Sequence, residues 1–349
     1  MPLSTLTPVE RLRRRRRSRR PLALLTLLLA AAALAAAWHW SPGGDAAPTA
    51  RASGSSVRVA PLVSAQETAR AARVAAAAHV AAAAKAQQVT APMLVVVPSQ
   101  PKAHIEPELT SRSAILIDGN TGQVIFWKNP HARVPIASVT KIMTGLLAIE
   151  QLKPNAVVTV APLATRAPPN KEGLVPHEQV PAWKLIYASM LFSGNDSALA
   201  LGMAVSGTRA RFLELMNSRA AELGMTDTHF NSASGVIDVD NYSSAWDMAA
   251  LSRVAMLNPR FRAIVGTKEK RVTWAAPINS KLYKNHNRLL TSYAGADGIK
   301  TGWTTVARHT LVGSAHRGKT WLIGVTLGSA DSFTDMERLL DLGFKLRGT

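Results

Sequence analysis

Apolar runs bounded by turn residues open the folded part of the sequence. Residues 113–117 and 123–127 read Ser-Ala-Ile-Leu-Ile and Gln-Val-Ile-Phe-Trp, which are compositions typical of strands. The residues between them, 118–122, are Asp-Gly-Asn-Thr-Gly and favour a turn. The pattern therefore predicts a β-hairpin at the start of the globular region.

Helical periodicity follows this hairpin. Residues 137–152 place Ile142, Leu146 and Ile149 on one stripe of a predicted helix. Helical patterns also dominate residues 181–257. The centre of the globular region is therefore predicted to be helical.

Strand patterns return after Asp297. Residues 298–301, 309–315 and 320–327 read as strands, with residues 316–319 as the turn between the last two, and residues 331–344 as a closing helix. A hairpin first, helices in the middle and strands last predict an α/β fold. Its first and last strands should meet in one mostly antiparallel sheet flanked by helices.

The first 40 residues have the layout of an export signal. Residues 11–20 are a basic block, residues 21–37 are uncharged and apolar, and turn-forming residues follow. The small residues at the end of the apolar run suit a cleavage site, whereas Trp38 and Trp40 suit an interfacial anchor. Residues 1–40 are therefore predicted to be an export signal or a membrane anchor. The Sec and twin-arginine routes both stay open.

Residues 41–108 are rich in Ala and Pro and nearly free of aromatic residues, which is typical of a low-complexity linker. The formal net charge of the whole chain is +19. A balance this basic suits anionic surroundings, but the sequence contains no nucleic-acid-binding motif. The chain has no cysteine, which excludes disulfides, thiolate catalysis and cysteine-based zinc sites.

Three short motifs that can carry chemistry occur in the globular region. Ser138 and Lys141 form a Ser-x-x-Lys motif, Ser193–Asn195 reads Ser-Gly-Asn, and Lys300–Gly302 reads Lys-Thr-Gly. Each motif alone is weak, because a second Ser-x-x-Lys begins at Ser99 among the prolines of the linker. Their occurrence together, each in a suitable structural context, is far more specific than any one of them.

The first motif begins a predicted helix, where backbone N–H groups and the helix dipole favour developing negative charge. Lys141 lies three residues after Ser138, so both side chains share one face. Burial or a neighbouring cation lowers the pKa of a lysine and frees its amine to accept a proton. Ser138 and Lys141 are therefore a candidate activated nucleophile that needs no histidine.

The other two motifs supply polar groups and a strand edge. The Ser193 hydroxyl and the Asn195 amide can bridge the lysine and hold a substrate amide. Lys300 and Thr301, on a predicted strand, can hold a terminal carboxylate, and Gly302 allows a close approach of the acyl group.

Around these motifs the sequence resembles the D-alanyl-D-alanine carboxypeptidases, which are low-molecular-mass penicillin-binding proteins. The resemblance covers residues 109–349 and implies a catalytic domain there, with the β-lactamase/DD-peptidase-like fold of a mostly antiparallel sheet, flanking helices and a helical subdomain. The segments that carry it are 135–144, 191–198 and 295–304, with support from 223–225, 230–231 and 243–248.

The resemblance implies a role for each motif residue and no cofactor. Ser138 would attack the carbonyl of the penultimate D-Ala, with Lys141 as general base. Ser193 would relay protons to the leaving amine, and Asn195 would hold the substrate amide. The remaining groups would bind the terminal carboxylate and the oxyanion: Lys300, Thr301, Gly302, and the backbone N–H groups of Ser138 and Trp303.

The implied partners are peptidoglycan stem peptides, β-lactams as covalent inhibitors, and the inner membrane if the N-terminal segment is not cleaved. Nucleic acid is not among them. The implied location is the periplasm or the outer face of the cell membrane.

Four alternatives remain at this point. The chain could be a DD-endopeptidase that cuts crosslinks, or a non-catalytic wall-binding protein. A class A-type β-lactamase needs a Glu-x-x-Leu-Asn loop after the second motif, but only Glu214 to Asn217, in a predicted helix, comes near it. A metal hydrolase is disfavoured because the histidines lack His-Glu-x-x-His spacing; among them are His177, His229, His286, His309 and His316.

Overall fold

The computed structural model of the protein describes residues 108–236, 239–276 and 278–349. The predicted export signal, residues 1–40, lies outside them, and so does the predicted linker, residues 41–108, apart from its last residue. The prediction of the domain boundaries therefore stays a prediction.

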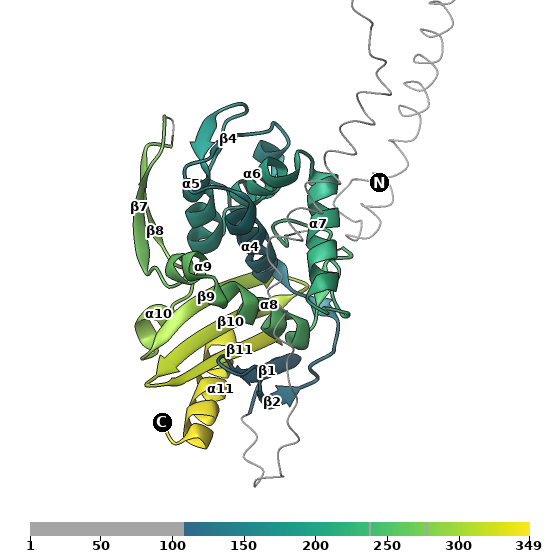
Figure 1. Cartoon of the computed structure of the whole chain (residues 1–349), viewed down its shortest axis with the longest axis vertical. Helices are drawn as coiled ribbons and strands as arrows, with labels where there is room; N and C mark the ends of the chain where they lie inside the picture. The colour runs from purple at the N-terminus through teal and green to yellow at the C-terminus, as the bar shows by residue number, and fades with distance from the viewer. Residues whose placement is uncertain (1–107, 237–238, 277) are drawn as a thin grey trace, which may run out of the picture. The chain divides into compact units, whose positions relative to one another are not determined.

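A five-stranded antiparallel sheet lies at one side of the described region (Figure 1). The first strand of the chain pairs with the last, so the two ends of the globular region meet in one sheet, as predicted. In spatial order the strands are β2 (Val124–Lys128), β1 (Ser113–Asp118), β11 (Thr320–Ser329), β10 (Arg308–Arg317) and β9 (Ala296–Thr304).

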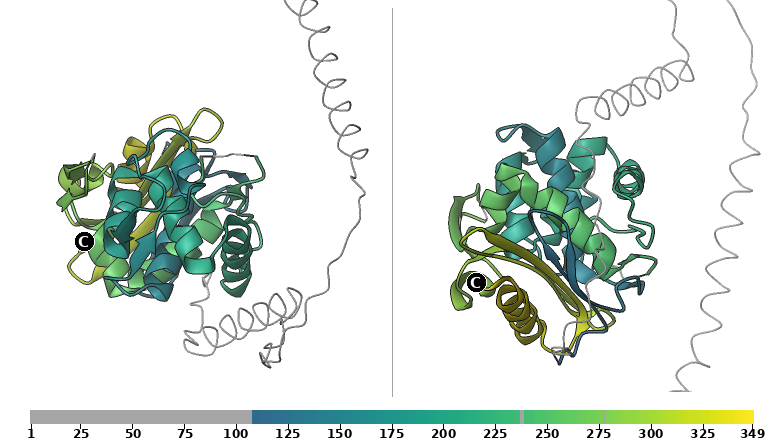
Figure 2. Two further views of the ribbon diagram at one scale, coloured as in Figure 1. Left: turned by 90° about the horizontal axis from the view of Figure 1, so that it is seen from above. Right: turned by 60° about the horizontal axis from the view of Figure 1, so that its bottom comes forward.

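Helices cover both faces of this sheet, which Figure 2 shows from two further directions. Side chains alternate between the faces of a strand, so one strand can serve two clusters. In β1, Ile115 and Ile117 join the large core under the helices, while Ala114 and Leu116 join a smaller cluster with α11 (Ser332–Arg347). All residues of β1 are therefore buried, and residues Ala114 to Ile117 form a continuous apolar run.

The remaining elements form the helical part and three small two-stranded sheets, which pair β3 with β6, β4 with β5, and β7 with β8. The helices are α4 (Lys141–Gln151), α5 (Ala182–Tyr187), α6 (Asn195–Ser206), α7 (Arg209–Glu222), α8 (Ala245–Leu257), α9 (Pro259–Val265) and α10 (Leu289–Ser292). The short strands are β3 (Val134–Pro135), β4 (Val157–Thr159), β5 (Gln179–Pro181), β6 (Tyr242–Ser243), β7 (Glu269–Thr273) and β8 (Ser280–Lys284).

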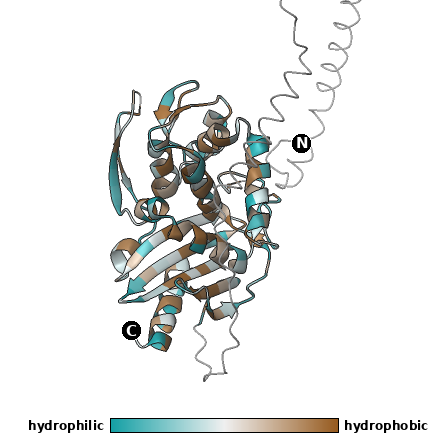
Figure 3. Cartoon of the chain, viewed as in Figure 1, coloured by the Kyte–Doolittle hydropathy of each residue, from teal (hydrophilic) through white to brown (hydrophobic). Residues whose placement is uncertain are grey.

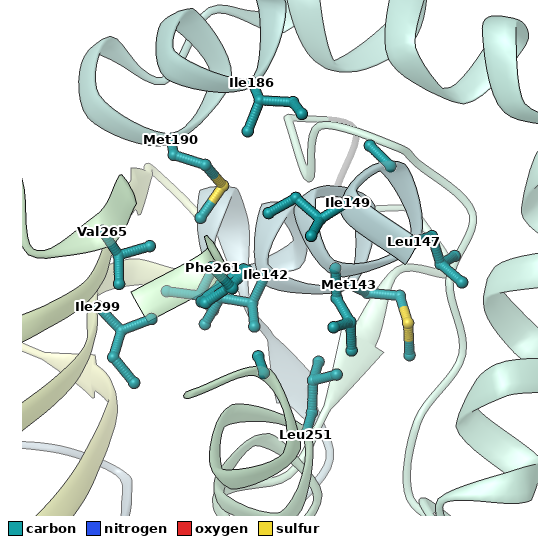
Figure 4. Close-up of a cluster of buried hydrophobic side chains, with 14 of the residues drawn as sticks. Ile142, Met143, Leu147, Ile149, Ile186, Met190, Leu251, Phe261, Val265 and Ile299 are labelled. Atoms are coloured by element: carbon teal, nitrogen blue, oxygen red, sulfur yellow. The ribbon is translucent and has the colours of Figure 1, made fainter. Parts of the chain in front are cut away.

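Helix α4 runs through the middle of the large core. Figure 4 shows its side chains, among them Ile142 and Ile149, packed against α5, α8, α9 and β9. Every residue of α4 from Lys141 to Ile149 is buried. A lysine at the first position of this helix is therefore removed from water by the fold itself.

The predicted fold class is confirmed, two local predictions need correction, and one element was missed. The segment 137–152 begins as a 3₁₀ turn, Ala137–Thr140, before α4 starts at Lys141. The turn predicted at 316–319 is shorter, because β10 continues to Arg317 and leaves Gly318 and Lys319 to reverse the chain. Hairpin β7–β8 was not predicted.

Candidate active site

Ser138 and Lys141 lie side by side at the start of α4. Ser138 sits in the 3₁₀ turn, where side chains three residues apart eclipse each other. The Lys141 Nζ atom lies 3.0 Å from the Ser138 Oγ atom. Ser138 is partly exposed whereas Lys141 is fully buried, so a ligand can reach the hydroxyl but not the amine.

Lys141 has two further partners, both deep in the protein. Its Nζ atom donates to Asn195 Oδ1 at 2.8 Å and to the carbonyl oxygen of Ser234 at 2.8 Å. Burial is the main reason that the pKa of Lys141 is well below its usual value; Lys300 lowers this pKa further and Asp196 opposes the shift. A neutral amine beside Ser138 can accept the hydroxyl proton.

Ser193 follows a π-helical segment, Ala188–Phe192, in a left-handed backbone conformation with φ of 67°. Its Oγ atom is buried and has no hydrogen-bond partner among the described residues. The sequence suggested that the Ser193 hydroxyl and the Asn195 amide bridge the lysine. In the structure Asn195 alone makes that contact, and the Ser193 hydroxyl remains available.

The amide of Asn195 is oriented from both ends. Its Oδ1 atom accepts from Lys141, and its Nδ2 atom donates to the carbonyl oxygen of Pro169 at 2.6 Å. The next residue, Asp196, accepts from the backbone N–H groups of Glu172, Gly173 and Leu174. The start of α6 therefore fixes the Pro169–Leu174 loop, and that loop fixes the amide of Asn195.

Strand β9 forms the opposite wall of the site. A Cβ atom at Gly302 would lie 2.8 Å from the backbone nitrogen of Ser138 and 2.5 Å from Thr310 Oγ1. Only a glycine therefore lets the strand lie this close to the nucleophile. Thr301 is partly buried and the side chain of Trp303 is 60% exposed, so both face accessible space along the edge strand.

Lys300 is the second buried cation of the site. Its Nζ atom donates to the carbonyl oxygen of Thr301 at 2.9 Å, and burial lowers the pKa of Lys300 to about 7. No carboxylate lies within ion-pairing distance of it among the residues described. An anionic group entering the site would favour the charged form of Lys300 and be held by it.

Comparisons with known proteins agree with this geometry. The family profile for peptidase S11, described as D-alanyl-D-alanine carboxypeptidase, matches residues 100–331. The chain belongs to this family. It is 33% identical over 260 residues to the D-alanyl-D-alanine carboxypeptidase of Streptomyces sp. strain K15, covering 69% of this chain and 89% of that protein.

A second curated relative is the D-alanyl-D-alanine carboxypeptidase DacF of Bacillus subtilis strain 168, 32% identical over 242 residues. The match covers 67% of this chain and 62% of DacF, so the chain spans about three fifths of that protein's length. A solved structure of a D-alanyl-D-alanine carboxypeptidase from Mycobacterium tuberculosis H37Rv shares 31% identity, with a TM-score of 0.66 over 71% of this chain and 96% of that one. Structures titled Streptomyces K15 DD-transpeptidase also match, one of them with 32% identity and a TM-score of 0.63 over 69% of this chain and 100% of that one. The family and the fold suggested by the sequence are both confirmed.

The three motifs read from the sequence meet at one place in the structure of this family member. Sequence reasoning missed the Ser234 carbonyl, which accepts from Lys141, and the role of Asp196 in holding the Pro169–Leu174 loop. The residue after Ser234 is Gly235, the only sign in the sequence that the backbone there is unusual. In the structure Gly235 has φ of +74°, and a Cβ atom added to it would collide with Ala137. A backbone carbonyl carries no residue-type signal, so the sequence could not identify it.

His286 is a second residue that the sequence did not connect with the site. Its backbone N–H donates to the Leu191 carbonyl, its ring lies 5.7 Å from that of Phe192, and part of the residue is exposed. Partial burial is the main reason that the pKa of His286 is lowered, and Lys300 and Lys141 lower it further. The charge of His286 is therefore coupled to the two buried lysines of the site.

Two other observations concern metal and membrane. Within residues 108–236, 239–276 and 278–349 there is no group of three or more histidine or acidic side chains that could hold a metal ion. None of the helices in this part of the chain is long and apolar enough to cross a bilayer.

The lowered pKa of Lys300 predicts a pH dependence. Lys300 must carry a proton to hold a carboxylate, so kcat/KM for a peptide with a free C-terminus should fall as the pH rises through about 7. The bound carboxylate favours the charged form, so kcat should persist to higher pH than kcat/KM. Steady-state kinetics between about pH 5 and 10 measure both.

The variant Lys300→Arg tests whether deprotonation of Lys300 causes the alkaline fall in kcat/KM, because a guanidinium stays charged throughout that pH range. The alkaline limb of its kcat/KM profile should move upward even if its maximum is lower. An alkaline limb at the same pH in both proteins would contradict the role of Lys300.

Proposed function

We propose that the protein is an exported serine-type D-Ala-D-Ala carboxypeptidase that acts on peptidoglycan stem peptides. One observation carries the proposal: the buried Lys141 amine lies 3.0 Å from the partly exposed Ser138 hydroxyl, and burial lowers the pKa of that amine. The family membership and the names of its relatives support the reaction class. The basic and apolar sequence of residues 1–40 supports export.

The acylation step uses the residues in this way. The Ser138 oxygen attacks the carbonyl carbon of the penultimate D-Ala while Lys141 takes the hydroxyl proton. The backbone N–H groups of Ser138 and Trp303 stabilise the negative oxygen, a contribution typically worth about 10²–10³ in rate. The C–N bond then breaks, and the proton passes to the departing amine, with the unpartnered Ser193 hydroxyl as the relay.

Binding places the peptide along β9. Lys300 and Thr301 hold its terminal carboxylate, and Asn195 holds the amide before the scissile bond. Water then adds to the ester carbon, the proton it gives up returns through Lys141, and the shortened peptide leaves with a new carboxylate. No cofactor takes part in this scheme. A β-lactam enters as a mimic of the dipeptide and remains attached to Ser138.

The β-lactamase alternative needs a carboxylate that activates the deacylating water. The Glu214–Asn217 segment lies on α7, where Asn217 Nδ2 donates to Leu213 and Phe230, which is a structural use of that residue. A buried carboxylate, Glu172, does lie in the loop next to Asn195, but its Oε2 atom accepts from Lys281 and Tyr283. The β-lactamase alternative is therefore not favoured.

One experiment with three substrates tests the proposal. The full-length protein is incubated with a stem pentapeptide, a crosslinked muropeptide dimer and penicillin, and products are identified by mass spectrometry. We expect release of D-Ala from the pentapeptide and a stable penicillin adduct. Cleavage of the dimer without D-Ala release would show that the protein is an endopeptidase. Rapid turnover of penicillin would show that it is a β-lactamase, and the absence of any product or adduct would show that it is a binding protein.

A further inference from the structure

Hairpin β7–β8 carries an unusual concentration of positive charge. Residues 266–288 contain six basic residues and one carboxylate, Glu269; the basic residues are Lys268, Lys270, Arg271, Lys281, Lys284 and Arg288. Figure 3 shows the hairpin as a largely hydrophilic ribbon standing beside the helical part. Like charges so close together repel one another, and an anionic or aromatic partner relieves that repulsion.

The inner face of the hairpin has such partners within the protein. Val272 and Tyr283 are buried, which shows which face packs inward. On that face Lys281 donates to Glu172 at 2.8 Å, and Lys270 lies 5.4 Å from the ring centre of Tyr187. The charges of this face are thus used to attach the hairpin to the domain.

The outer face carries one carboxylate, Glu269, beside its cations. We define the outer strip as three exposed cations: Lys268 just before β7, Arg271 in β7 and Lys284 at the end of β8. Alternation along the strands puts Arg271 and Lys284 on the face opposite Val272 and Tyr283, whereas Lys268 lies at the base of the hairpin. No ion pair joins any of them to a carboxylate within the described part of the chain, although Glu269 lies opposite Lys284 in the strand register. Leu282, 42% exposed, lies opposite Arg271. Glu269 offsets one of the three positive charges, so the outer strip keeps a net positive charge that faces solvent.

The base of the hairpin adjoins the active site. Strand β8 packs on the π-helical segment that ends at Phe192, with the rings of Tyr283 and Phe192 5.9 Å apart. Just after the strand, the N–H of His286 donates to Leu191. Since Ser193 follows Phe192 directly, the base of the hairpin borders the segment that carries Ser193.

We propose that the outer strip of hairpin β7–β8 is a docking surface for the carboxylate-bearing peptides of polymeric peptidoglycan. This rests on the proposed function. Each stem peptide ends in a carboxylate, so a polymer presents these groups repeatedly, and strands next to the one being cleaved reach the hairpin. Several weak ion pairs acting together hold a polymer far better than one pair holds a single peptide. The strip therefore favours polymeric over soluble substrate.

The test compares two variants that each lose three positive charges. One is Lys268→Gln/Arg271→Gln/Lys284→Gln on the outer strip. The matched control is Arg211→Gln/Lys319→Gln/Lys345→Gln, three exposed residues without an ion pair among the described residues. Each full-length protein is assayed for D-Ala release from a soluble pentapeptide and for cosedimentation with purified sacculi freed of attached phosphate polymers.

We expect the outer-strip variant to bind stripped sacculi about tenfold or more weakly, while the control binds like wild type. Salt at about 0.5 M should remove the difference, because it screens charges beyond a few ångströms. Activity on the soluble pentapeptide should be the same in all three proteins.

Equal binding of both variants would overturn the proposal. So would a defect seen only with sacculi that retain phosphate polymers, because the partner would then be those polymers. If the wild-type protein released no D-Ala, the proposed function would be overturned instead. The cosedimentation assay measures binding separately, so its result would not depend on that activity.

Discussion

Replacing Ser138 by alanine is expected to abolish the covalent penicillin adduct and to lower D-Ala release by roughly 10⁴–10⁶-fold. The reason is that Ser138 Oγ is the group to which both the peptide and the antibiotic would become bonded. The truncation removes one atom from a partly exposed position, so the fold should remain intact. Intact-mass measurement after incubation with penicillin reads the adduct directly.

The chain offers a matched control for this prediction. Ser99 begins the other Ser-x-x-Lys motif of the sequence, so Ser99→Ala removes a serine from the same local pattern. This variant should acquire the full penicillin adduct at the wild-type rate. An adduct that survives Ser138→Ala, or one that disappears in Ser99→Ala, would refute the nucleophile assignment.

Lys141→Met should lower the rate of acylation by about 10²–10⁴-fold, the range expected when a general base is removed. Methionine keeps an unbranched apolar chain within the buried start of α4 but has no amine to take the Ser138 proton. Stopped-flow or quenched-flow labelling with a fluorescent penicillin measures this step separately from hydrolysis of the acyl-enzyme.

Lys141→Arg distinguishes a base from a mere positive charge. A guanidinium remains protonated at any accessible pH, so this variant should be as slow as Lys141→Met even though it keeps a cation. Lys345→Met, at an exposed position of α11, is the control for loss of a lysine and should acylate normally. Substantial activity in Lys141→Arg would show that Lys141 acts by charge alone.

Much of the fold was readable from sequence because its strands and helices carry strong patterns. Strand β1 is apolar from Ala114 to Ile117, since both faces of the sheet are covered, and α4 has a clear helical stripe. Hairpin β7–β8 escaped prediction for the opposite reason. Its strands are short and rich in charge, and Val272 and Tyr283 are the only buried positions within them. So few buried positions give no usable period.

The candidate site divides in the same way. Its side chains lie in motifs that can be read along the chain, so Ser138, Lys141, Asn195 and Lys300 were all identified beforehand. Their partners are contacts between distant segments: Asn195 rather than Ser193 bonds to Lys141, and the Ser234 carbonyl completes its environment. These contacts arise from loop conformations that no local pattern records.

The sequence by itself therefore determined the order of the elements, the three motifs and the family, since these depend on residue type and spacing. Only the tertiary structure decided the protonation chemistry. The pKa values of Lys141 and Lys300 are lowered mainly by burial, and burial is produced by the packing of α4, α6 and β9 together. A lysine in an unfolded chain has an ordinary pKa. Desolvation by segments distant in the sequence lowers the pKa of Lys141 and Lys300 and so suits them to proton transfer and to carboxylate binding.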